Sequence, residues 1–202
     1  MDQLDIYDEN GKPLGRMDSF EVHAQGVWHK TVHCWLYTKS GDVLFQMRAD
    51  GGKCYTTASG HIVAGETMQQ GFAREVFEEL GYAADINAAQ LVEIIPWRLD
   101  KGTAYKDRAF ANVYIAEFGG QLTDFNYQTD EVSGIVKVNA RKCLEIFKNG
   151  GGKIEAEVMQ IENEQKKVSK RKFTLADFLV FGHESAITKY GRVLEAIINA
   201  TR

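Results

Sequence analysis

The chain has 202 residues, 44% of them hydrophobic, and 24 lysines and arginines against 28 acidic residues give a net charge of −4. This size supports a single domain (1–202) with a sizeable core and argues against a second full domain. The weakly negative charge excludes a global basic field, so we expect no nucleic-acid partner. No apolar run approaches membrane-spanning length, and we expect no membrane partner.

The cysteines and the N-terminus predict a compartment. Cys34, Cys54 and Cys143 are widely spaced and form no CxxC pair, a pattern typical of reduced thiols. The first residues are polar and acidic and do not resemble a secretion signal. We therefore expect a cytoplasmic protein.

The chain begins with short extended segments. An Asn-Gly turn signal in DENGKPLG predicts a hairpin over 6–15, within an N-terminal extension of residues 1–30. Apolar runs over 33–37 and 43–47 predict a second hairpin. A further strand leads into Gly60.

A helix is predicted from Met68 to Leu80. Thr67 followed by Gln70 forms a capping-box pattern, and Gly81 stands where a left-handed residue ends a helix. The helix therefore has a defined start and a defined end.

This helix is predicted to have one acidic and one buried face. At about 100° per residue, Glu75, Glu78 and Glu79 share a sector, with Arg74 beside Glu78. A separate apolar sector, which we expect to be buried, contains Phe72, Ala73, Val76, Phe77 and Leu80. No lysine occurs from Cys54 to Trp97 to relieve the acidic repulsion, so the sequence predicts a site for hard cations.

Strands and a helix follow the acidic helix. Strands are predicted over 91–99 and 109–118, joined by a charged turn that begins Asp100-Lys101-Gly102, and over 134–138. A helix over 141–148 ends at a glycine triplet. The order of strands and helices indicates an α+β fold.

The C-terminal extension, residues 150–202, is less regular. Alternation over 154–158 predicts a strand, and the polar run ENEQKKVSKRK predicts an exposed turn. Thr174 and Asp177 indicate a helix start. A final helix is predicted from an apolar stripe formed by Ala186, Ile187, Tyr190, Val193, Leu194, Ile197 and Ile198. For residues 150–175, a lid, a partner surface and a disordered excursion all stay open.

The stretch GHIVAGETMQQGFAREVFEELGY resembles the Nudix hydrolase signature. All its fixed positions match, at Gly60, Glu66, Arg74, Glu75, Glu78, Glu79 and Gly81, while Tyr82 is aromatic where the family has an aliphatic residue. The resemblance implies an α/β/α sandwich with a mixed sheet, and Mg²⁺- or Mn²⁺-dependent cleavage of a small-molecule diphosphate, usually a nucleoside diphosphate derivative. A homodimer is compatible with this expectation.

Residue roles follow from the same resemblance. It implies metal binding by Glu79 and Glu75, with support from Glu78 and the carbonyl of Gly60, while Arg74 orients a glutamate. The general base stays open. In many family members a distal carboxylate completes the site, and Glu131 in TDEVSG, or its neighbour Asp130, is the candidate.

A second likeness concerns the run EVHAQGVWHKTVHCWLY and the later SGHIVAGE. These segments are similar to the isopentenyl-diphosphate isomerase branch, in which comparable histidines bind metal and a catalytic cysteine precedes the glycine. Ser59 occupies that cysteine position here, so hydrolysis is favoured over isomerisation. The histidines of these segments, which we interpret as core or structural residues, are His23, His29, His33 and His61.

A third reading is a nucleotide-sensing Nudix domain without catalysis. Such domains typically lose metal-binding glutamates, and this chain keeps all of them. The aromatic residues Trp28, Tyr55 and Trp97 could stack a base or belong to the core. The sequence therefore does not name the nucleoside.

Overall fold

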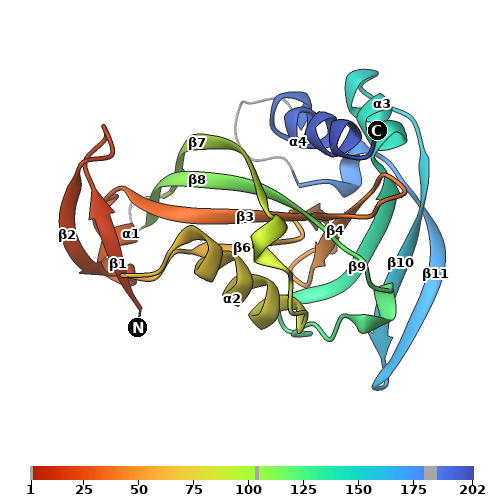
Figure 1. Ribbon diagram of the computed structural model, residues 1–202, viewed down its shortest axis with the longest axis horizontal. Coiled ribbons are helices and arrows are strands. Elements are labelled where there is room, and N and C mark those ends of the chain that lie inside the picture. Colours follow the sequence, from red (N-terminus) through yellow and green to blue (C-terminus); the bar gives the residue numbers. More distant parts are fainter. Residues whose placement is uncertain (1, 103–104, 180–185) are drawn as a thin grey trace.

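The computed structural model describes residues 2–102, 105–179 and 186–202, which form two β-sheets and helices on both faces of the larger sheet (Figure 1). The strands are β1 (Gln3–Tyr7), β2 (Pro13–Asp18), β3 (His29–Tyr37), β4 (Asp42–Arg48), β5 (Cys54–Tyr55), β6 (Ala58–His61), β7 (Gln90–Lys101), β8 (Tyr105–Glu117), β9 (Val132–Asn139), β10 (Ile154–Glu162) and β11 (Gln165–Phe173). The α-helices are α1 (Ser19–Gln25), α2 (Met68–Leu80), α3 (Ala140–Lys148) and α4 (Ala186–Ala200), and one-turn 3₁₀ helices span Ile86–Ala88, Leu122–Asp124 and Leu175–Asp177.

The larger sheet has the strand order β11-β10-β9-β4-β3-β8-β7, with β5 beside β4 and β6 beside β3. Strands β3 and β8 run parallel, from the pair His29 and Ala109 to the pair Tyr37 and Glu117. The other pairs of described strands in this sheet are antiparallel. The predicted mixed sheet is therefore confirmed.

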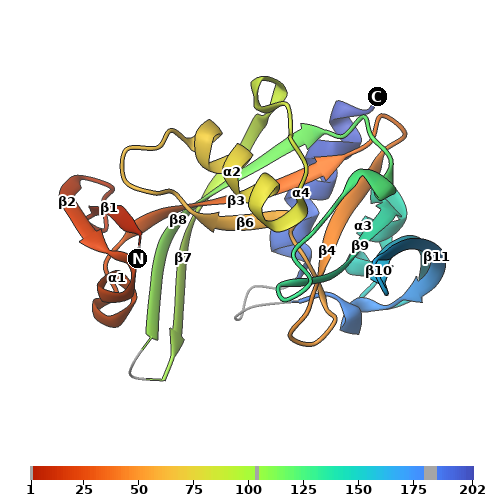
Figure 2. The same ribbon diagram turned by 90° about the horizontal axis from the view of Figure 1, so that it is seen from below.

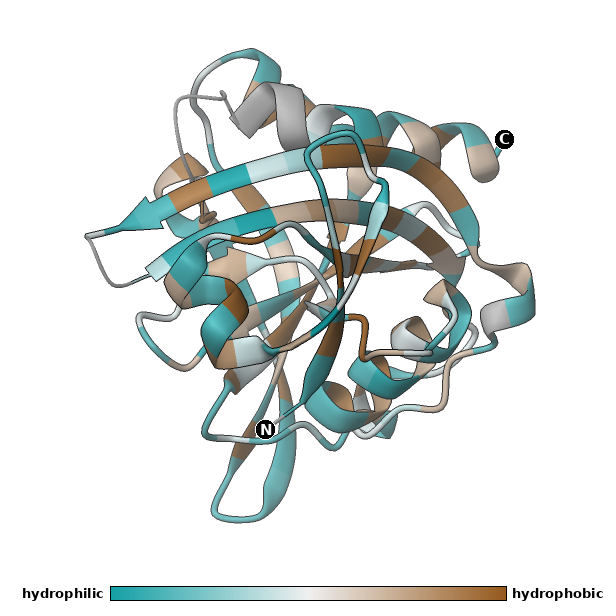
Figure 3. Ribbon diagram, turned by 90° about the vertical axis from the view of Figure 1, so that its left-hand side faces the viewer, coloured by the Kyte–Doolittle hydropathy of each residue, from teal (hydrophilic) through white to brown (hydrophobic). Residues whose placement is uncertain are grey.

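Helices cover both faces of this sheet. Helix α2 lies on one face, and α3 and α4 lie on the other (Figure 1). Figure 3 shows runs of hydrophobic residues along the long strands, and β4 is buried at five successive residues, Val43 to Met47, as expected for a sheet that is covered on both faces. The predicted α/β/α sandwich is confirmed. Among the described residues, no helix is long and apolar enough to cross a membrane.

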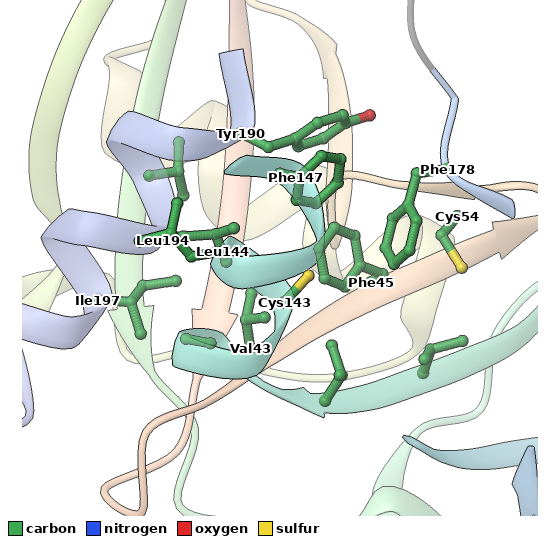
Figure 4. Packing of buried hydrophobic residues seen from close by; sticks show 14 of the residues in the cluster. Val43, Phe45, Cys54, Cys143, Leu144, Phe147, Phe178, Tyr190, Leu194 and Ile197 are labelled. Carbon is green, nitrogen blue, oxygen red and sulfur yellow. The ribbon is translucent and has the colours of Figure 1, made fainter. Parts of the chain in front are cut away.

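Aromatic side chains fill the core between the sheet and α3 and α4 (Figure 4). Phe147 stacks on Tyr190 at 5.3 Å between ring centroids, and Phe45 meets Phe178 edge to face at 5.1 Å. The stripe on α4 is buried at Tyr190, Val193, Leu194, Ile197 and Ile198, as predicted. The side chains of its first two members, Ala186 and Ile187, lie outside the described part.

The N-terminal hairpin β1–β2 forms its own two-stranded sheet at one end of the molecule, next to α1 (Figure 2). This confirms the predicted hairpin. Isolated bridges join Leu4 to Val63, which follows β6, and Tyr7 to Trp28, which directly precedes β3. The hairpin is therefore attached to the larger sheet at two points. The anchoring brings α1 close to the N-terminal end of β3.

The interpretation of ENEQKKVSKRK as an exposed turn is wrong. Residues 165–173 form β11, which pairs with β10 from Glu162 opposite Gln165 to Ile154 opposite Phe173. Only Asn163 and Glu164, with φ of 49° and 63°, form the turn. Because β11 is exposed on both faces up to Lys172, it lacks the alternation that predicts a strand. A disordered excursion is likewise excluded there.

The helix start at Thr174 and Asp177 is confirmed only as one 3₁₀ turn. Asp177 accepts hydrogen bonds from the backbone and the hydroxyl of Thr174, which caps the turn. The chain then becomes extended at Phe178, whose ring enters the core. The helix therefore ends after a single turn.

Candidate active site

Helix α2 has both of its predicted ends. The Thr67 side chain accepts from the backbone of Gln70, and the Gln70 side chain accepts from the backbone of Thr67. At the other end Gly81 has a φ of 61°, and its N–H donates to Phe77. These caps fix where the acidic residues of the helix lie.

The apolar face of α2 differs in two respects from the prediction. Phe72, Val76 and Leu80 are buried against the sheet, but Ala73 is only partly buried and Phe77 is 61% exposed. The helix is rotated about its axis so that Glu75 and Glu79 also point toward the sheet. This rotation turns Phe77, at the other edge of the apolar face, to solvent. The prediction of a buried Phe77 is therefore wrong.

Gly60 and Glu75 are in direct contact. Gly60 lies in β6, and a Cβ added to it would overlap the carboxylate of Glu75. Glu75 is only 8% exposed, and burial raises its pKa although Arg74 opposes the shift. The absence of a side chain at position 60 is thus what admits a buried carboxylate beside the backbone.

Glu79 lies beside this pair. Its carboxylate accepts a hydrogen bond of 2.9 Å from the amide of Gln46 in β4 and one of 3.4 Å from the backbone of Ser59. Burial, and next the charge of Glu75, raise the pKa of Glu79 to about 8. A buried and a partly buried carboxyl that disfavour each other's ionisation form an environment that a cation would stabilise.

Arg74 connects the site to its surroundings. Its guanidinium donates to Glu66 at 2.8 Å, to Glu75 at 2.8 Å and to Glu78 at 2.9 Å. It also donates to the carbonyl of His61 at 2.7 Å. The pKa of Arg74 is raised, chiefly by Glu66, so the residue is a fixed cation that orients the acidic face.

The structure brings the distal loop to the same place. A cavity of about 470 Å³ is lined by Glu79, Glu131 and Asp130, together with Gln46, Arg48, Asp50 and Ser59. Glu78 differs, since its side chain is 52% exposed and its carboxylate pairs with Arg74. The candidate residues on α2, β6 and the distal loop therefore form one region.

A second cavity, of about 240 Å³, adjoins the first, and Arg48 and Ser59 line both. Tyr55 and Trp97 contribute aromatic walls, and Lys101 a cation. Trp28 does not line it but stacks on Phe110 with ring centroids 4.7 Å apart. Two of the three aromatic residues singled out in the sequence thus border the site, and the third belongs to the packing.

The histidines were interpreted in the sequence as core or structural residues, although the likeness to the isomerase branch implies metal binding by comparable histidines. Ligand atoms of His23, His29 and His61 all lie within 4.8 Å of one another, in a group that could hold a metal ion. His33 lies outside this group, near Tyr55, and lines the smaller cavity, as His61 also does. Burial lowers the pKa of His29 and of His61 to about 4, so both imidazoles are neutral at pH 7.

Comparison with known proteins identifies the family. The family model of the NUDIX domain matches residues 27–156, and the chain therefore belongs to the Nudix family. An uncharacterized Nudix hydrolase from Clostridium acetobutylicum is 32% identical over 177 residues, which cover 83% of this chain and 85% of that protein. An isopentenyl-diphosphate Delta-isomerase from Corynebacterium diphtheriae is 36% identical over 149 residues, covering 69% and 79%.

Solved structures agree on the fold. A crystal structure of a Deinococcus radiodurans protein, DR0079, superposes with a TM-score of 0.53 at 18% sequence identity, covering 73% of this chain and 89% of that one. This likeness supports the architecture alone. Family membership and the Nudix hydrolase relative make the chain an enzyme of the pyrophosphohydrolase class.

Proposed function

We propose that this enzyme hydrolyses the diphosphate linkage of a nucleoside diphosphate derivative or a related small pyrophosphate, using Mg²⁺ or Mn²⁺. The observation that carries the proposal is the contact between Gly60 and the buried Glu75, with Glu79 beside them. Carboxylate and carbonyl oxygens are the donors that these cations prefer. The residues present therefore fit a divalent ion.

The metal ligands in this proposal are the Gly60 carbonyl, Glu75 and Glu79, with Glu78 in support. A divalent ion bound there would neutralise the diphosphate and lower the pKa of a bound water. Arg74 acts as a positioning residue, because it holds Glu66, Glu75 and Glu78 at once. Its role is to keep these carboxylates, including the buried Glu75, oriented.

The general base comes from the larger cavity. Glu131 and Glu79 both line it, and Glu131 is one of the charges that raise the pKa of Glu79. Both carboxylates are candidates for this role, and Glu79 can fill it only in its ionised form, which a bound cation would favour. The variants Glu131→Gln and Asp130→Asn distinguish the two acidic residues of the loop. A loss of turnover in Glu131→Gln but not in Asp130→Asn supports Glu131 as the general base.

The reaction is tested with a panel of nucleoside diphosphate derivatives and other small pyrophosphates. Phosphate or nucleotide release is measured with Mg²⁺, Mn²⁺ or Ca²⁺ and in EDTA. We expect turnover of at least one compound with Mg²⁺ or Mn²⁺, and little with Ca²⁺, because of its looser coordination. No turnover across the panel would favour a nucleotide-sensing domain.

Isomerisation of an isoprenoid diphosphate is a second candidate. The relatives named isopentenyl-diphosphate Delta-isomerase and the buried histidine group favour it. The intact acidic set and Ser59 favour hydrolysis, because a serine hydroxyl is far less acidic than a thiol. We therefore place hydrolysis first.

A further inference from the structure

The loop of residues 62–67 joins β6 to α2, and every backbone N–H group in it donates a hydrogen bond. For most of these groups the acceptor lies in β3, in the loop itself or in the first turn of α2. The acceptors for Ala64 and Gly65 lie in the N-terminal hairpin instead. The hairpin therefore completes the hydrogen bonding of a loop that leads into the acidic helix.

Asp5 of β1 contacts this loop through its side chain. Its Oδ2 atom accepts from the N–H of Gly65 at 2.9 Å, and its Oδ1 atom accepts from Nε of Arg16 at 3.1 Å. Beside this contact, the N–H of Ala64 donates to the backbone carbonyl of Gln3 at 2.7 Å. Two successive N–H groups of the loop are therefore held by β1.

Gly65 needs a partner of this kind because of its backbone conformation. Its φ is 87°, in the left-handed region that favours glycine. A Cβ added there would meet Nη2 of Arg16 at 3.6 Å, an ordinary contact, so glycine is required for its conformation and not for space. Glycine adopts left- and right-handed conformations about equally well, and the bond to Asp5 favours the one observed.

The loop is connected to the carboxylate site by Glu66. Its Oε2 atom accepts from the N–H of Val63 at 2.9 Å, and its two oxygens accept from the guanidinium of Arg74 at 2.8 and 3.1 Å. Arg74 in turn donates to Glu75 and to the carbonyl of His61. The conformation of the loop therefore determines where Arg74 and the Glu75 carboxylate are held.

The N-terminal hairpin is suited to act as a fixed support. Leu4, Ile6 and Val22 are buried together and give β1 and α1 a small apolar core of their own. Leu4 also bridges to Val63 of the loop. Asp5 stands between two of these core residues in β1, so packing on either side fixes its position.

We propose that Asp5 is a positioning residue of the carboxylate site, and that its bond to Gly65 strengthens cation binding by holding the loop and Arg74 in place. Residues that orient metal ligands change the affinity of a site without binding the ion themselves. Asp5 precedes residues 27–156, the part of the chain that the NUDIX family model matches. This inference deepens the proposed function and rests on its metal site.

The bond is tested by hydrogen exchange of the Gly65 N–H, followed by NMR on the full chain in EDTA. Exchange should be at least about threefold faster in Asp5→Ala than in wild type, because one hydrogen bond is lost. Asp5→Asn keeps a side-chain oxygen that can accept, so it should stay closer to wild type. Equal exchange in wild type and Asp5→Ala overturns the proposal.

The effect on the carboxylate site is tested by Mn²⁺ titration, with free Mn²⁺ followed by electron paramagnetic resonance. Asp5→Ala should bind Mn²⁺ at least about threefold more weakly than wild type, and Asp5→Asn should recover part of the loss. Glu9→Ala is the matched control, because it removes the same charge from the same hairpin at a residue that faces Arg98 at 3.8 Å. Equal losses in Asp5→Ala and Glu9→Ala overturn the proposal, since the missing charge alone would then explain them.

Gly65→Ala changes the same loop from the other side of the bond and keeps the test decisive if Asp5→Ala does not fold. Alanine is disfavoured in the left-handed region, so the loop should shift and Mn²⁺ binding should weaken about threefold or more. Wild-type affinity in this variant overturns the proposal.

The two readouts separate the ways in which the proposal can fail. Faster exchange at Gly65 with unchanged Mn²⁺ affinity overturns the positioning role and leaves the proposed hydrolysis intact. Absence of Mn²⁺ binding in wild type also overturns the positioning role, but it places the failure at the carboxylate site of the proposed function.

Discussion

The carboxylate of Glu75 lies directly against the backbone of Gly60, although the two residues are 15 positions apart in the chain. Strand β6 and helix α2 pack so closely here that no side chain fits at position 60. The position of the Glu75 carboxylate therefore depends on the backbone conformation at Gly60.

Gly60→Ala tests this contact. The added methyl must displace Glu75, so we expect weaker Mn²⁺ binding, a fall in kcat of about tenfold or more, and a loss of about 1–3 kcal/mol of stability from overpacking. Gly119→Ala is the matched control, because a Cβ there has no neighbour within 4 Å. Wild-type kinetics for Gly60→Ala would contradict the role of this contact.

Local patterns were sufficient to predict α2 and its caps and to gather Glu75, Glu78 and Glu79 on the helix, whereas their roles as metal ligands come from the resemblance and stay a prediction. Those features depend on the helix period and on a spacing contained within 23 residues, 60 to 82. The distal-loop residue Glu131 was a candidate only through resemblance, and the structure places it on the cavity of Glu79.

The proximity of three histidines and the strand β11 could not be predicted from local patterns. His23, His29 and His61 come from three elements, and their sequence separations carry no information on distance. Strand β11 pairs only with β10 at the edge of the sheet, so neither face needs apolar residues. Both features depend on contacts between residues that are far apart in the sequence, and no local pattern of residues indicates those contacts.

The β10–β11 turn gives a prediction about stability alone. Glu164 has a φ of 63°, a left-handed conformation that favours glycine. We expect Glu164→Gly, which creates the Asn-Gly pair of a two-residue hairpin, to stabilise the protein by about 0.5–1 kcal/mol in a thermal melt. Glu162→Gly, within β10, should lower the melting temperature. A lower melting temperature for Glu164→Gly would contradict the turn.

Glu79→Gln tests the carboxylate site by turnover. The change removes one charged oxygen ligand and keeps the side-chain shape, so kcat should fall by about two orders of magnitude or more on any substrate of the wild type. The folded state should be retained, as shown by circular dichroism. Near wild-type turnover would remove Glu79 from the metal site.

Isomerase activity is expected to be absent. Ser59 stands before Gly60 where the isomerase-like pattern has a cysteine, and a hydroxyl does not exchange protons at carbon as a thiol does. Proton NMR of isopentenyl diphosphate with the enzyme and Mg²⁺ should show no dimethylallyl product. The Corynebacterium diphtheriae isomerase provides the positive control, and product at a comparable rate would overturn the hydrolase proposal.

The raised pKa of Glu79 makes metal-free stability depend on pH. Its folded-state pKa of about 8 lies above the value near 4.3 of an unfolded glutamate, so the folded state holds the proton more tightly. The contribution of Glu79 to the free energy of unfolding is therefore most favourable below about pH 4 and is lost as pH rises to about 8. Glu79→Gln stays neutral throughout and removes this loss.

In EDTA, Glu79→Gln should thus melt higher than wild type near pH 8, and the difference should shrink toward pH 5. Saturating Mn²⁺ should raise the melting temperature of wild type more than that of the variant, since a cation stabilises the ionised carboxylate that binds it. Glu78→Gln is the comparison, because its side chain is half exposed and should give a smaller difference in EDTA. The contrary outcome is a lower melting temperature for Glu79→Gln than for wild type in EDTA at pH 8, with the same rise on adding Mn²⁺ as in wild type. Glu79 would then be a structural hydrogen-bond acceptor for Gln46, and the cation would bind elsewhere.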